Sequence, residues 1–340
     1  MDVAIVGGGA WGSALACHAA RLGHGVRLWA REREVVAQVN TERRNDVFLP
    51  GVTFPEGVRA SSAFAEVLTG AGMVILVMPS QHLREVTALL AADVPPDALV
   101  VVATKGIESA TLELMTQVAA ESLPGVTSER LAVLSGPSFA REVAAGLQAD
   151  VVVASEGAVA ARAIQPHLHH PMLRVYTGAD PIGVELGGAI KNVIAIATGA
   201  CDGLGLGANA RAALITRGLA EITRLGVALG ADPLTFLGLA GVGDLVLTCT
   251  GDLSRNRTLG LKLAEGVDAA SYVASQPTVA EGYATTAAAY RLARKVGVEM
   301  PVTEQLYHVL YEGRRLEDAV RLLVGRTFKD ELHGIRLPIA

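Results

Sequence analysis

The sequence predicts an α/β protein in which a doubly wound parallel sheet is followed by an all-helical domain. Three observations carry this prediction. A strand, a glycine-rich turn and an alanine-rich helix follow one another at the start of the chain. Short apolar runs typical of buried strands then alternate with helical segments up to about residue 179, as in parallel βαβ units. From residue 180 the periodicity is helical nearly throughout, so we expect two domains, residues 1–179 and 180–340.

The first strand and turn have the pattern of a dinucleotide-binding fingerprint. Residues 3–6 are apolar, and Gly7, Gly9 and Gly12 fit G-x-G-x-x-G directly before a helix. In this pattern the first glycine permits a tight turn, the second lets a pyrophosphate approach the backbone, and the third lets helix and strand pack closely. The alternative is a purely structural turn, but the position between a strand and a helix favours a nucleotide site.

The end of the second predicted strand, residues 26–29, indicates which nucleotide is used. An NAD site usually has Asp or Glu there to bind the ribose 2′-hydroxyl. This chain instead has Ala-Arg-Glu-Arg at residues 30–33, and the guanidiniums of Arg31 and Arg33 suit a 2′-phosphate. The sequence therefore favours NADP(H), while Glu32 keeps NAD(H) possible. The alternative is that both arginines are solvated loop charges.

Further apolar runs predict the rest of the sheet, at residues 73–77, 99–103, 131–134, 151–154 and 173–176. Ligands of such a sheet bind beyond the carboxyl ends of its strands. The loop at residues 45–51, which includes Phe48, is expected either to cover a cofactor or to serve only as a connection.

Two polar segments directly follow predicted strands. Lys105 lies beside Gly106 and is placed to contact a substrate; the alternative is a surface lysine whose stem covers apolar surface. The turn at residues 135–140 offers the Ser138 hydroxyl and free N–H groups. It lacks G-x-S-x-G, so no nucleophilic serine is expected, and Ser138 could instead be a helix N-cap.

Lys191 is the strongest candidate for acid–base chemistry. It lies with Glu185 in an otherwise uncharged apolar helix predicted over residues 182–200. A buried ammonium loses solvation, which lowers its pKa unless it is paired. We therefore predict a general acid or base, with hydrogen bonds added by Asn192. The alternative is a structural buried ion pair.

Asp244 and Thr248 are four residues apart near the start of another predicted helix, so they share one face. Asp244 either only caps that helix or pairs with Lys191 and orients it.

Residues 254–257, Ser-Arg-Asn-Arg, lead into a further predicted helix, and their hydroxyl, guanidinium and amide groups suit a phosphate. Solvated loop charge is the alternative. Glu281 is either a first-turn carboxylate or a cofactor contact.

The composition argues against long disordered tracts and against one class of partner, nucleic acids. Hydrophobic residues make up 51% of the 340 residues and charged residues 19%, which suits folded domains rather than long disordered tracts. The net charge of −5 and the lack of a basic run argue against nucleic-acid binding. An anionic ligand must therefore be bound by local cations.

The reactive residue types indicate a reducing compartment and no metal. The three cysteines, Cys17, Cys201 and Cys249, are far apart and give neither metal spacing nor a disulfide framework. Three histidines within residues 167–170 lack a further ligand, so we expect a solvated loop there. The chain enters a strand without room for a signal peptide, and Lys191 interrupts the longest apolar helix. We expect a soluble cytoplasmic protein without a membrane span.

Taken in order, these motifs resemble those of the bacterial-type NAD(P)-dependent glycerol-3-phosphate dehydrogenases. The resemblance extends over roughly residues 3–325. It rests on residues 7–16, 105–106, 136–140, 190–197, 212–218, 241–250 and 254–257. It implies a Rossmann domain before a helical substrate domain, with the active site in the cleft. It also implies hydride transfer that interconverts sn-glycerol 3-phosphate and dihydroxyacetone phosphate and supplies glycerol 3-phosphate for phospholipid synthesis.

The resemblance also implies a role for each matching residue. Lys191 would be the proton donor and acceptor, and the catalytic group would further comprise Lys105, Asp244, Thr248 and Asn192. The substrate and its phosphate would be bound by Lys105, Gly136, Ser138, Asp244, Ser254, Arg255 and Asn256. The cofactor would be bound by Gly7, Gly9, Ala10, Trp11, Gly12, Arg31, Phe48, Lys105, Ala140, Arg255, Val279 and Glu281.

Three positions depart from the family's usual pattern. Ala10 replaces a common Ser, Phe48 a commoner Tyr and Ala208 a commoner Asp. These changes are expected to affect cofactor affinity and to leave the reaction intact. Two rivals remain, a dehydrogenase of the same architecture that acts on a carboxylate substrate and a non-catalytic nucleotide sensor. A homodimer is possible, because the helical domain is rich in apolar residues.

Overall fold

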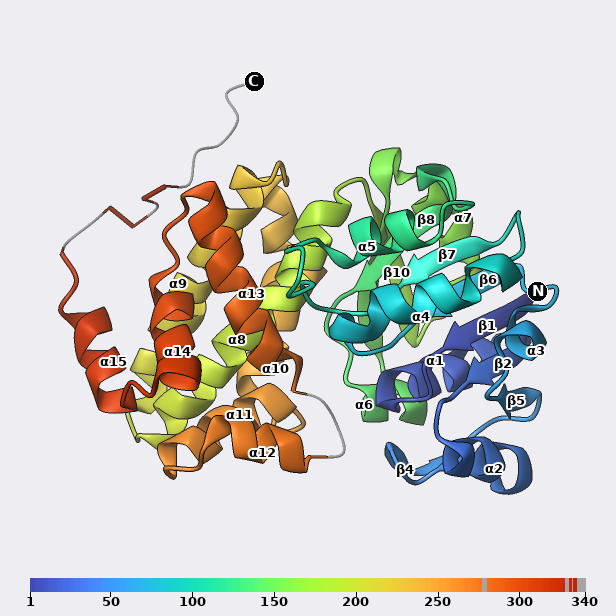
Figure 1. Ribbon diagram of the computed structural model, residues 1–340, viewed down its shortest axis with the longest axis horizontal. Helices are drawn as coiled ribbons and strands as arrows, with labels where there is room; N and C mark the ends of the chain where they lie inside the picture. Colours follow the sequence, from blue (N-terminus) through green and yellow to red (C-terminus); the bar gives the residue numbers. More distant parts are fainter. Residues whose placement is uncertain (277–279, 328–329, 332, 335–340) are drawn as a thin grey trace. The chain divides into compact units, whose positions relative to one another are not determined.

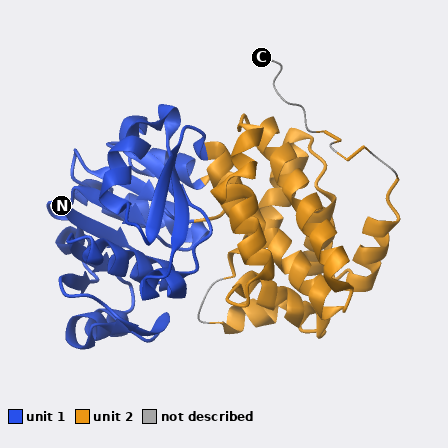
Figure 2. Ribbon diagram, turned by 180° about the vertical axis from the view of Figure 1, so that it is seen from behind, with its two compact units in different colours: residues 1–104, 115–181 blue, residues 105–114, 182–340 orange. Residues whose placement is uncertain are grey.

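The computed structural model describes residues 1–276, 280–327, 330, 331, 333 and 334 (Figure 1). The chain falls into two compact units, which Figure 2 colours separately. The first comprises Met1–Thr104 and Met115–Pro181, and the second comprises Lys105–Leu114 and Ile182–Ala340. The division into domains at residues 179 and 180 stays a prediction. The structure adds that Lys105–Leu114, which directly follows a strand region of the first unit, packs within the second.

An eight-stranded sheet forms the centre of the first unit, in the order β10-β9-β8-β7-β6-β1-β2-β5. Its strands are β1 (Asp2–Val6), β2 (Gly25–Trp29), β5 (Val58–Ser61), β6 (Met73–Leu76), β7 (Leu99–Val102), β8 (Leu131–Ser135), β9 (Ala149–Ala154) and β10 (Leu173–Gly178). Neighbouring strands pair in parallel except β8 and β9, which are antiparallel. A small antiparallel pair, β3 (Arg44–Asn45) and β4 (Leu49–Thr53), lies in the segment expected to be a loop.

Helices cover both faces of this sheet. Alternate strand residues point to opposite faces, so Val3 and Ile5 belong to one apolar core while Ala4 and Val6 belong to another. The first core includes residues of α1 (Ala10–Arg21), α2 (Arg33–Glu42), α6 (Ala140–Ala145) and α7 (Val159–Leu168). The second includes residues of α3 (Phe64–Leu68), α4 (Leu83–Leu90) and α5 (Met115–Ser122). The predicted doubly wound parallel sheet is thus confirmed, and the structure adds one antiparallel pairing, that of β8 with β9.

The second unit is built of helices, as predicted. They are α8 (Pro181–Gly203), α9 (Gly207–Ala228), α10 (Asp244–Thr250), α11 (Arg255–Ala264), α12 (Ala269–Ser275), α13 (Glu281–Val296), α14 (Pro301–Glu312) and α15 (Leu316–Val324). Helix α8 is apolar on nearly every side, and its residues Ile190, Val193 and Ile194 lie wholly within the core of this unit. A helix that is hydrophobic all round is expected to be buried, and this one is.

Helix α8 also corrects an expectation from the sequence. By length and composition alone it could cross a membrane, although Lys191 was expected to keep every apolar run below that length. In the structure 94% of its most apolar window is buried inside the protein. That burial is typical of the core helix of a globular unit, so the helix is weak evidence for a membrane span.

Glycines let other segments approach the backbone of α8 closely. A Cβ on Gly187 would lie 2.3 Å from the carbonyl oxygen of Ala240, in the turn before α10. A Cβ on Gly199 would lie 2.0 Å from the carbonyl oxygen of Arg257 in α11, and one on Gly260 would lie 2.0 Å from that of Ile196. Both α10 and α11 are therefore held against the helix that carries Lys191.

Candidate active site

Two lysines meet at one buried carboxylate in the second unit. Lys191 lies midway along α8 with 9% of its side chain exposed, and Asp244 is the first residue of α10 with 1% exposed. The Lys191 ammonium donates a hydrogen bond to Asp244 Oδ1. Lys105 Nζ donates to the other oxygen, Oδ2, over 2.7 Å. Of the two sequence interpretations of Asp244, pairing with Lys191 is the one that the structure contains.

The chain around Asp244 is shaped to present this carboxylate. Residues Leu239–Gly243 form a single wide turn, in which Gly241 leaves the helical conformation. A Cβ on Gly241 would lie 2.1 Å from the carbonyl oxygen of Phe236, so only glycine fits there. One helical turn after Asp244, Thr248 Oγ1 accepts a hydrogen bond from Lys191 Nζ over 2.9 Å and donates to the Asp244 carbonyl over 2.6 Å. The lysine is thereby held from two sides.

The electrostatics of this cluster poise Lys191 for proton transfer. Burial lowers the pKa of Lys191 to about 8, the Asp244 charge opposes this shift, and the Lys105 charge adds to it. Burial by itself would raise the pKa of Asp244, but the two lysines and their hydrogen bonds overcome it and hold that pKa below its usual value. Near neutral pH the cluster therefore contains a carboxylate and an ammonium that can give up or regain its proton.

Two amides connect α8 with the helices beside it. Asn256 Nδ2 donates to Asn192 Oδ1 over 2.8 Å, and Asn256 Oδ1 accepts from the backbone N–H of Gly282 over 3.0 Å. Ser254 caps α11, because its Oγ accepts from the Arg257 N–H over 3.2 Å. Ser254 and Asn256 are buried, whereas Arg255 between them is exposed. Glu281, the first residue of α13, immediately precedes Gly282.

The glycine-rich turn between β1 and α1 has the features that a nucleotide site needs. Gly7 has φ +131°, and a Cβ there would lie 1.8 Å from the Val77 carbonyl oxygen. A Cβ on Gly12 would lie 1.9 Å from the Gly7 carbonyl oxygen, so the helix packs directly on the turn. A Cβ on Gly9 would meet no other atom of the described residues within 4 Å, and no side chain caps the N-terminus of α1. The helix N-terminus is thus available to an anion.

The next two cofactor candidates open α1. Ala10 is the first residue of the helix and Trp11 the second. The Trp11 Nε1 is buried and has no hydrogen-bond partner within the part of the chain that the structure describes.

Asn45 is a buried neighbour of the glycine-rich turn that the sequence did not reveal. Its side chain is fully buried, and its Nδ2 donates to the Gly8 carbonyl over 2.8 Å and to Ser13 Oγ over 2.9 Å. Its Oδ1 accepts from the Phe48 N–H over 3.2 Å. Asn45 thus holds the glycine-rich turn and the segment with Phe48 together. No spacing rule marks such an amide, since its partners lie 37 and 32 residues away.

The remaining candidates of the first unit lie at strand ends. Arg31 follows β2, has 78% of its side chain exposed and is paired with Glu32, whose Oε1 lies 3.0 Å from Arg31 Nη2.

Gly136 follows β8 with φ +134°, and Ser138 Oγ donates to its carbonyl over 2.9 Å. The residue that precedes α6 is Phe139, so the interpretation of Ser138 as a helix cap is wrong. Ala140 opens α6. Val279 lies outside the described residues.

The thiols and potential metal ligands offer little chemistry. Burial raises the pKa of the Cys249 thiol to about 12 and that of Cys17 to about 11, so neither is a ready thiolate. Among the described residues, no group of three or more histidine, cysteine, aspartate or glutamate side chains could hold a metal ion.

Comparison with known proteins assigns both halves of the chain. Residues 2–161 match the family model described as NAD-dependent glycerol-3-phosphate dehydrogenase N-terminus, and residues 180–321 match its C-terminus. A glycerol-3-phosphate dehydrogenase [NAD(P)+] from Geobacter sulfurreducens is 51% identical over 329 residues, which are 97% of this chain and 98% of that one.

Solved structures agree with this assignment. The crystal structure of glycerol-3-phosphate dehydrogenase from Coxiella burnetii has a TM-score of 0.90 at 42% identity, covering 96% of this chain and 99% of that one. A yeast glycerol-3-phosphate dehydrogenase, from Saccharomyces cerevisiae, has a TM-score of 0.80 at 25% identity, covering 96% and 99%.

The buried cluster predicts a stability effect of the Asp244→Asn substitution. Without the carboxylate, the Lys191 ammonium must either remain buried and unpaired or lose its proton, so the free energy of unfolding should fall by about 3–5 kcal/mol. Denaturation in urea at pH 7, followed by circular dichroism, measures this change. The double substitution Asp244→Asn with Lys191→Met should recover part of the loss. A single variant as stable as the native protein, or a double variant with no recovery, would contradict the pairing.

Proposed function

Because the chain belongs to the NAD-dependent glycerol-3-phosphate dehydrogenase family, we propose that Lys191 is the acid–base group of its reaction. The family consists of NAD(P)-dependent oxidoreductases that act on a CH–OH group. The reaction interconverts sn-glycerol 3-phosphate and dihydroxyacetone phosphate. The observation that carries the proposal is the Asp244 carboxylate held between Lys191 and Lys105.

The first unit has the features to bind the dinucleotide. The uncapped N-terminus of α1, the open face at Gly9 and the buried Trp11 Nε1 fit a nicotinamide cofactor. When bound, such a cofactor supplies or accepts the hydride. The proposed cofactor-binding residues are Gly7, Gly9, Ala10, Trp11, Gly12, Arg31, Phe48, Lys105, Ala140, Arg255 and Glu281, together with Val279 outside the described residues.

Lys191 then handles the proton. As the ketone is reduced, negative charge develops on the oxygen at C2, and the Lys191 ammonium donates a proton to that oxygen. In the reverse direction the neutral amine accepts the proton from the hydroxyl. Asp244 and Thr248 orient the Nζ atom, and the second positive charge, on Lys105, stabilises the developing oxyanion.

The first turn of α11 is the proposed phosphate site. It combines the Ser254 hydroxyl, the exposed Arg255 guanidinium and the buried Asn256 amide with the positive end of a helix. Asn256 is bonded to Asn192, the residue after Lys191, so phosphate binding and proton transfer are linked through adjacent positions of α8. Gly136 and Ser138 are the other proposed substrate contacts. Fixing the remote phosphate uses its binding energy to orient the reacting carbon.

We further propose that the enzyme forms sn-glycerol 3-phosphate for phospholipid synthesis in the cytoplasm. This product has two free hydroxyl groups beside a phosphate, which suits it to acylation. The similarity to bacterial glycerol-3-phosphate dehydrogenases supports the proposal. A homodimer remains a proposal as well, supported by exposed apolar side chains of the second unit such as Leu234, Leu237 and Val324.

Lys191→Ala should abolish most turnover and leave cofactor binding intact. Loss of a positioned acid–base group lowers the rate by about 10²–10⁴-fold. In the native enzyme, kcat/KM for dihydroxyacetone phosphate reduction should fall as pH rises through about 8, because the ammonium donor is lost. Oxidation of glycerol 3-phosphate should rise through the same pH, because it needs the neutral amine. Nicotinamide absorbance measures the rates and its fluorescence measures binding. Retained turnover would remove Lys191 from the mechanism.

Arg31 should favour NADPH over NADH. Its guanidinium follows β2, where the fingerprint places the residue that contacts the ribose. Arg31→Ala should raise the KM for NADPH about tenfold, the effect of losing a charged hydrogen bond, and leave the KM for NADH unchanged. Arg162→Ala, which removes an exposed charge from α7, is the matched control and should leave both KM values unchanged. Equal KM values for NADPH and NADH in the native enzyme would contradict this role and leave Arg31 as a solvated surface charge.

A further inference from the structure

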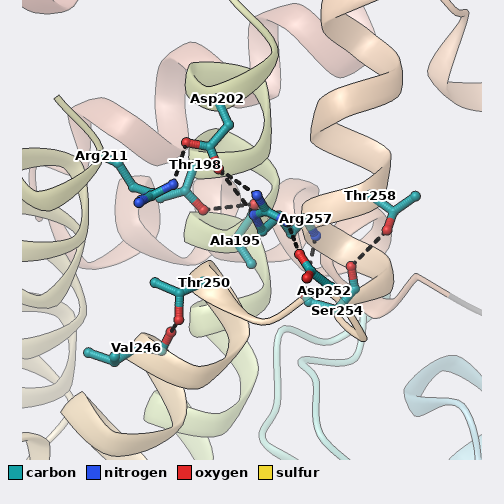
Figure 3. Close-up of polar contacts among 10 residues, drawn as sticks. All are labelled: Ala195, Thr198, Asp202, Arg211, Val246, Thr250, Asp252, Ser254, Arg257 and Thr258. Carbon is teal, nitrogen blue, oxygen red and sulfur yellow. Dashed lines mark hydrogen bonds and ion pairs between the residues drawn. The ribbon is translucent and has the colours of Figure 1, made fainter. Parts of the chain in front are cut away.

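An ion cluster of Asp202, Arg211, Asp252 and Arg257 adjoins the first turn of α11, where we place the phosphate site (Figure 3). Asp202, near the end of α8, accepts at Oδ2 from Arg257 Nε over 3.1 Å and from Arg257 Nη2 over 2.9 Å. Its Oδ1 accepts from Arg211 Nη1, on α9, over 3.0 Å. The remaining terminal nitrogen of Arg257, Nη1, lies 3.0 Å from the exposed Asp252. Nothing in the proposed reaction uses these four side chains.

Arg257 connects this cluster with the phosphate site. It is the third residue of α11, and its N–H is the group that the Ser254 hydroxyl caps. Its carbonyl oxygen packs on α8 where a Cβ at Gly199 would be only 2.0 Å away. The first turn of α11 is thus fixed to α8 through both the backbone and the side chain of one residue.

Helix α8 carries both the proposed acid–base group and Asp202, which pairs with Arg257 in the first turn of α11. Lys191 and Asn192 lie about three turns before Asp202 on α8, and Asn256 is bonded to Asn192. A displacement of the first turn of α11 would therefore change the separation between the phosphate ligands and Lys191. In a reaction that depends on orientation, a shift of about 1 Å costs roughly a hundredfold in rate.

We propose that Asp202 is a positioning residue that, through Arg257, sets the first turn of α11 so that Ser254, Arg255 and Asn256 bind the substrate phosphate. This inference rests on the proposed function of that turn. The burial of the cluster supports it, because 13% of the Asp202 side chain and 16% of the Arg257 side chain are exposed, against 96% for Asp252. A carboxylate that receives two hydrogen bonds from one guanidinium fixes geometry, whereas an exposed pair contributes little.

The test is the substitution Asp202→Asn, assayed with dihydroxyacetone phosphate and with dihydroxyacetone, which lacks the phosphate. We expect KM for dihydroxyacetone phosphate to rise about tenfold, the effect of losing a charged hydrogen bond, and kcat to fall as well, because the displaced phosphate ligands no longer orient the reacting carbon. We expect kcat/KM for dihydroxyacetone to stay at the native value. If Asp202 acted only through its charge, its removal would strengthen phosphate binding and lower this KM. A raised KM therefore indicates that Asp202 acts by positioning the turn.

Asp252→Asn is the matched control, because it removes the same charge from the exposed side of the same arginine. It should leave both substrates unaffected. Arg257→Lys keeps the positive charge but loses the two-point contact, and it should reproduce the Asp202→Asn pattern. If Asp202→Asn does not fold, as judged by circular dichroism, Arg257→Lys carries the test.

Three results would overturn the inference. These are native kinetics in both Asp202→Asn and Arg257→Lys, equal losses on both substrates, and a lowered KM for dihydroxyacetone phosphate. Failure of the native protein to reduce dihydroxyacetone phosphate at all would overturn the proposed function, and the inference would fall with it. A native protein that is active with the phosphate substrate, together with variants that match it, would overturn the role of Asp202 alone.

Discussion

The site depends on one buried carboxylate that balances only one of the two positive charges beside it. Asp244 receives Lys105 on one oxygen and Lys191 on the other, so an excess positive charge stays in a place that water barely reaches. Burial lowers the pKa of Lys191 to about 8, and the excess charge adds to that shift. In the proposed reaction the same charge would stabilise the substrate oxygen that becomes negative. The choice of residue matters in this chain, which has 24 arginines and five lysines. A guanidinium in place of Lys191 would keep its proton at every accessible pH.

Helix α8 brings the parts of this arrangement to one place. Its apolar surface forces it into the core of the second unit, which strips solvent from Lys191. Glycines remove the side chains that would keep its neighbours away, at Gly187 for the turn before Asp244 and at Gly199 for α11. Asn192 and Asp202 then hold α11 at two further points along the same helix. One helix thus sets the solvation of the lysine, its counter-ion and the turn proposed to bind phosphate.

Much of this could be predicted from the sequence, because some features are local. The glycine spacing between a strand and a helix predicts the turn before α1, and a lone ammonium in an apolar helix identifies Lys191. The features that the sequence did not predict depend on partners that are distant in the sequence. Asn45 reaches Gly8 across the fold, and the antiparallel pairing of β8 with β9 is not encoded in either strand's own residues. Likewise, Lys105 directly follows a strand region of the first unit but packs within the second. There its ammonium pairs with Asp244, which is 139 residues away in the sequence.

The most direct test of this account is the pKa of Lys191 itself, measured by NMR of protein labelled at the lysine side chains. With five lysines in the chain, the resonance absent from Lys191→Met identifies the residue. We predict that this resonance titrates at about pH 8 and that Lys105→Met moves its titration to higher pH, because a like charge has been removed. Titration near the ordinary lysine value of 10.5, or no response to Lys105→Met, would contradict it.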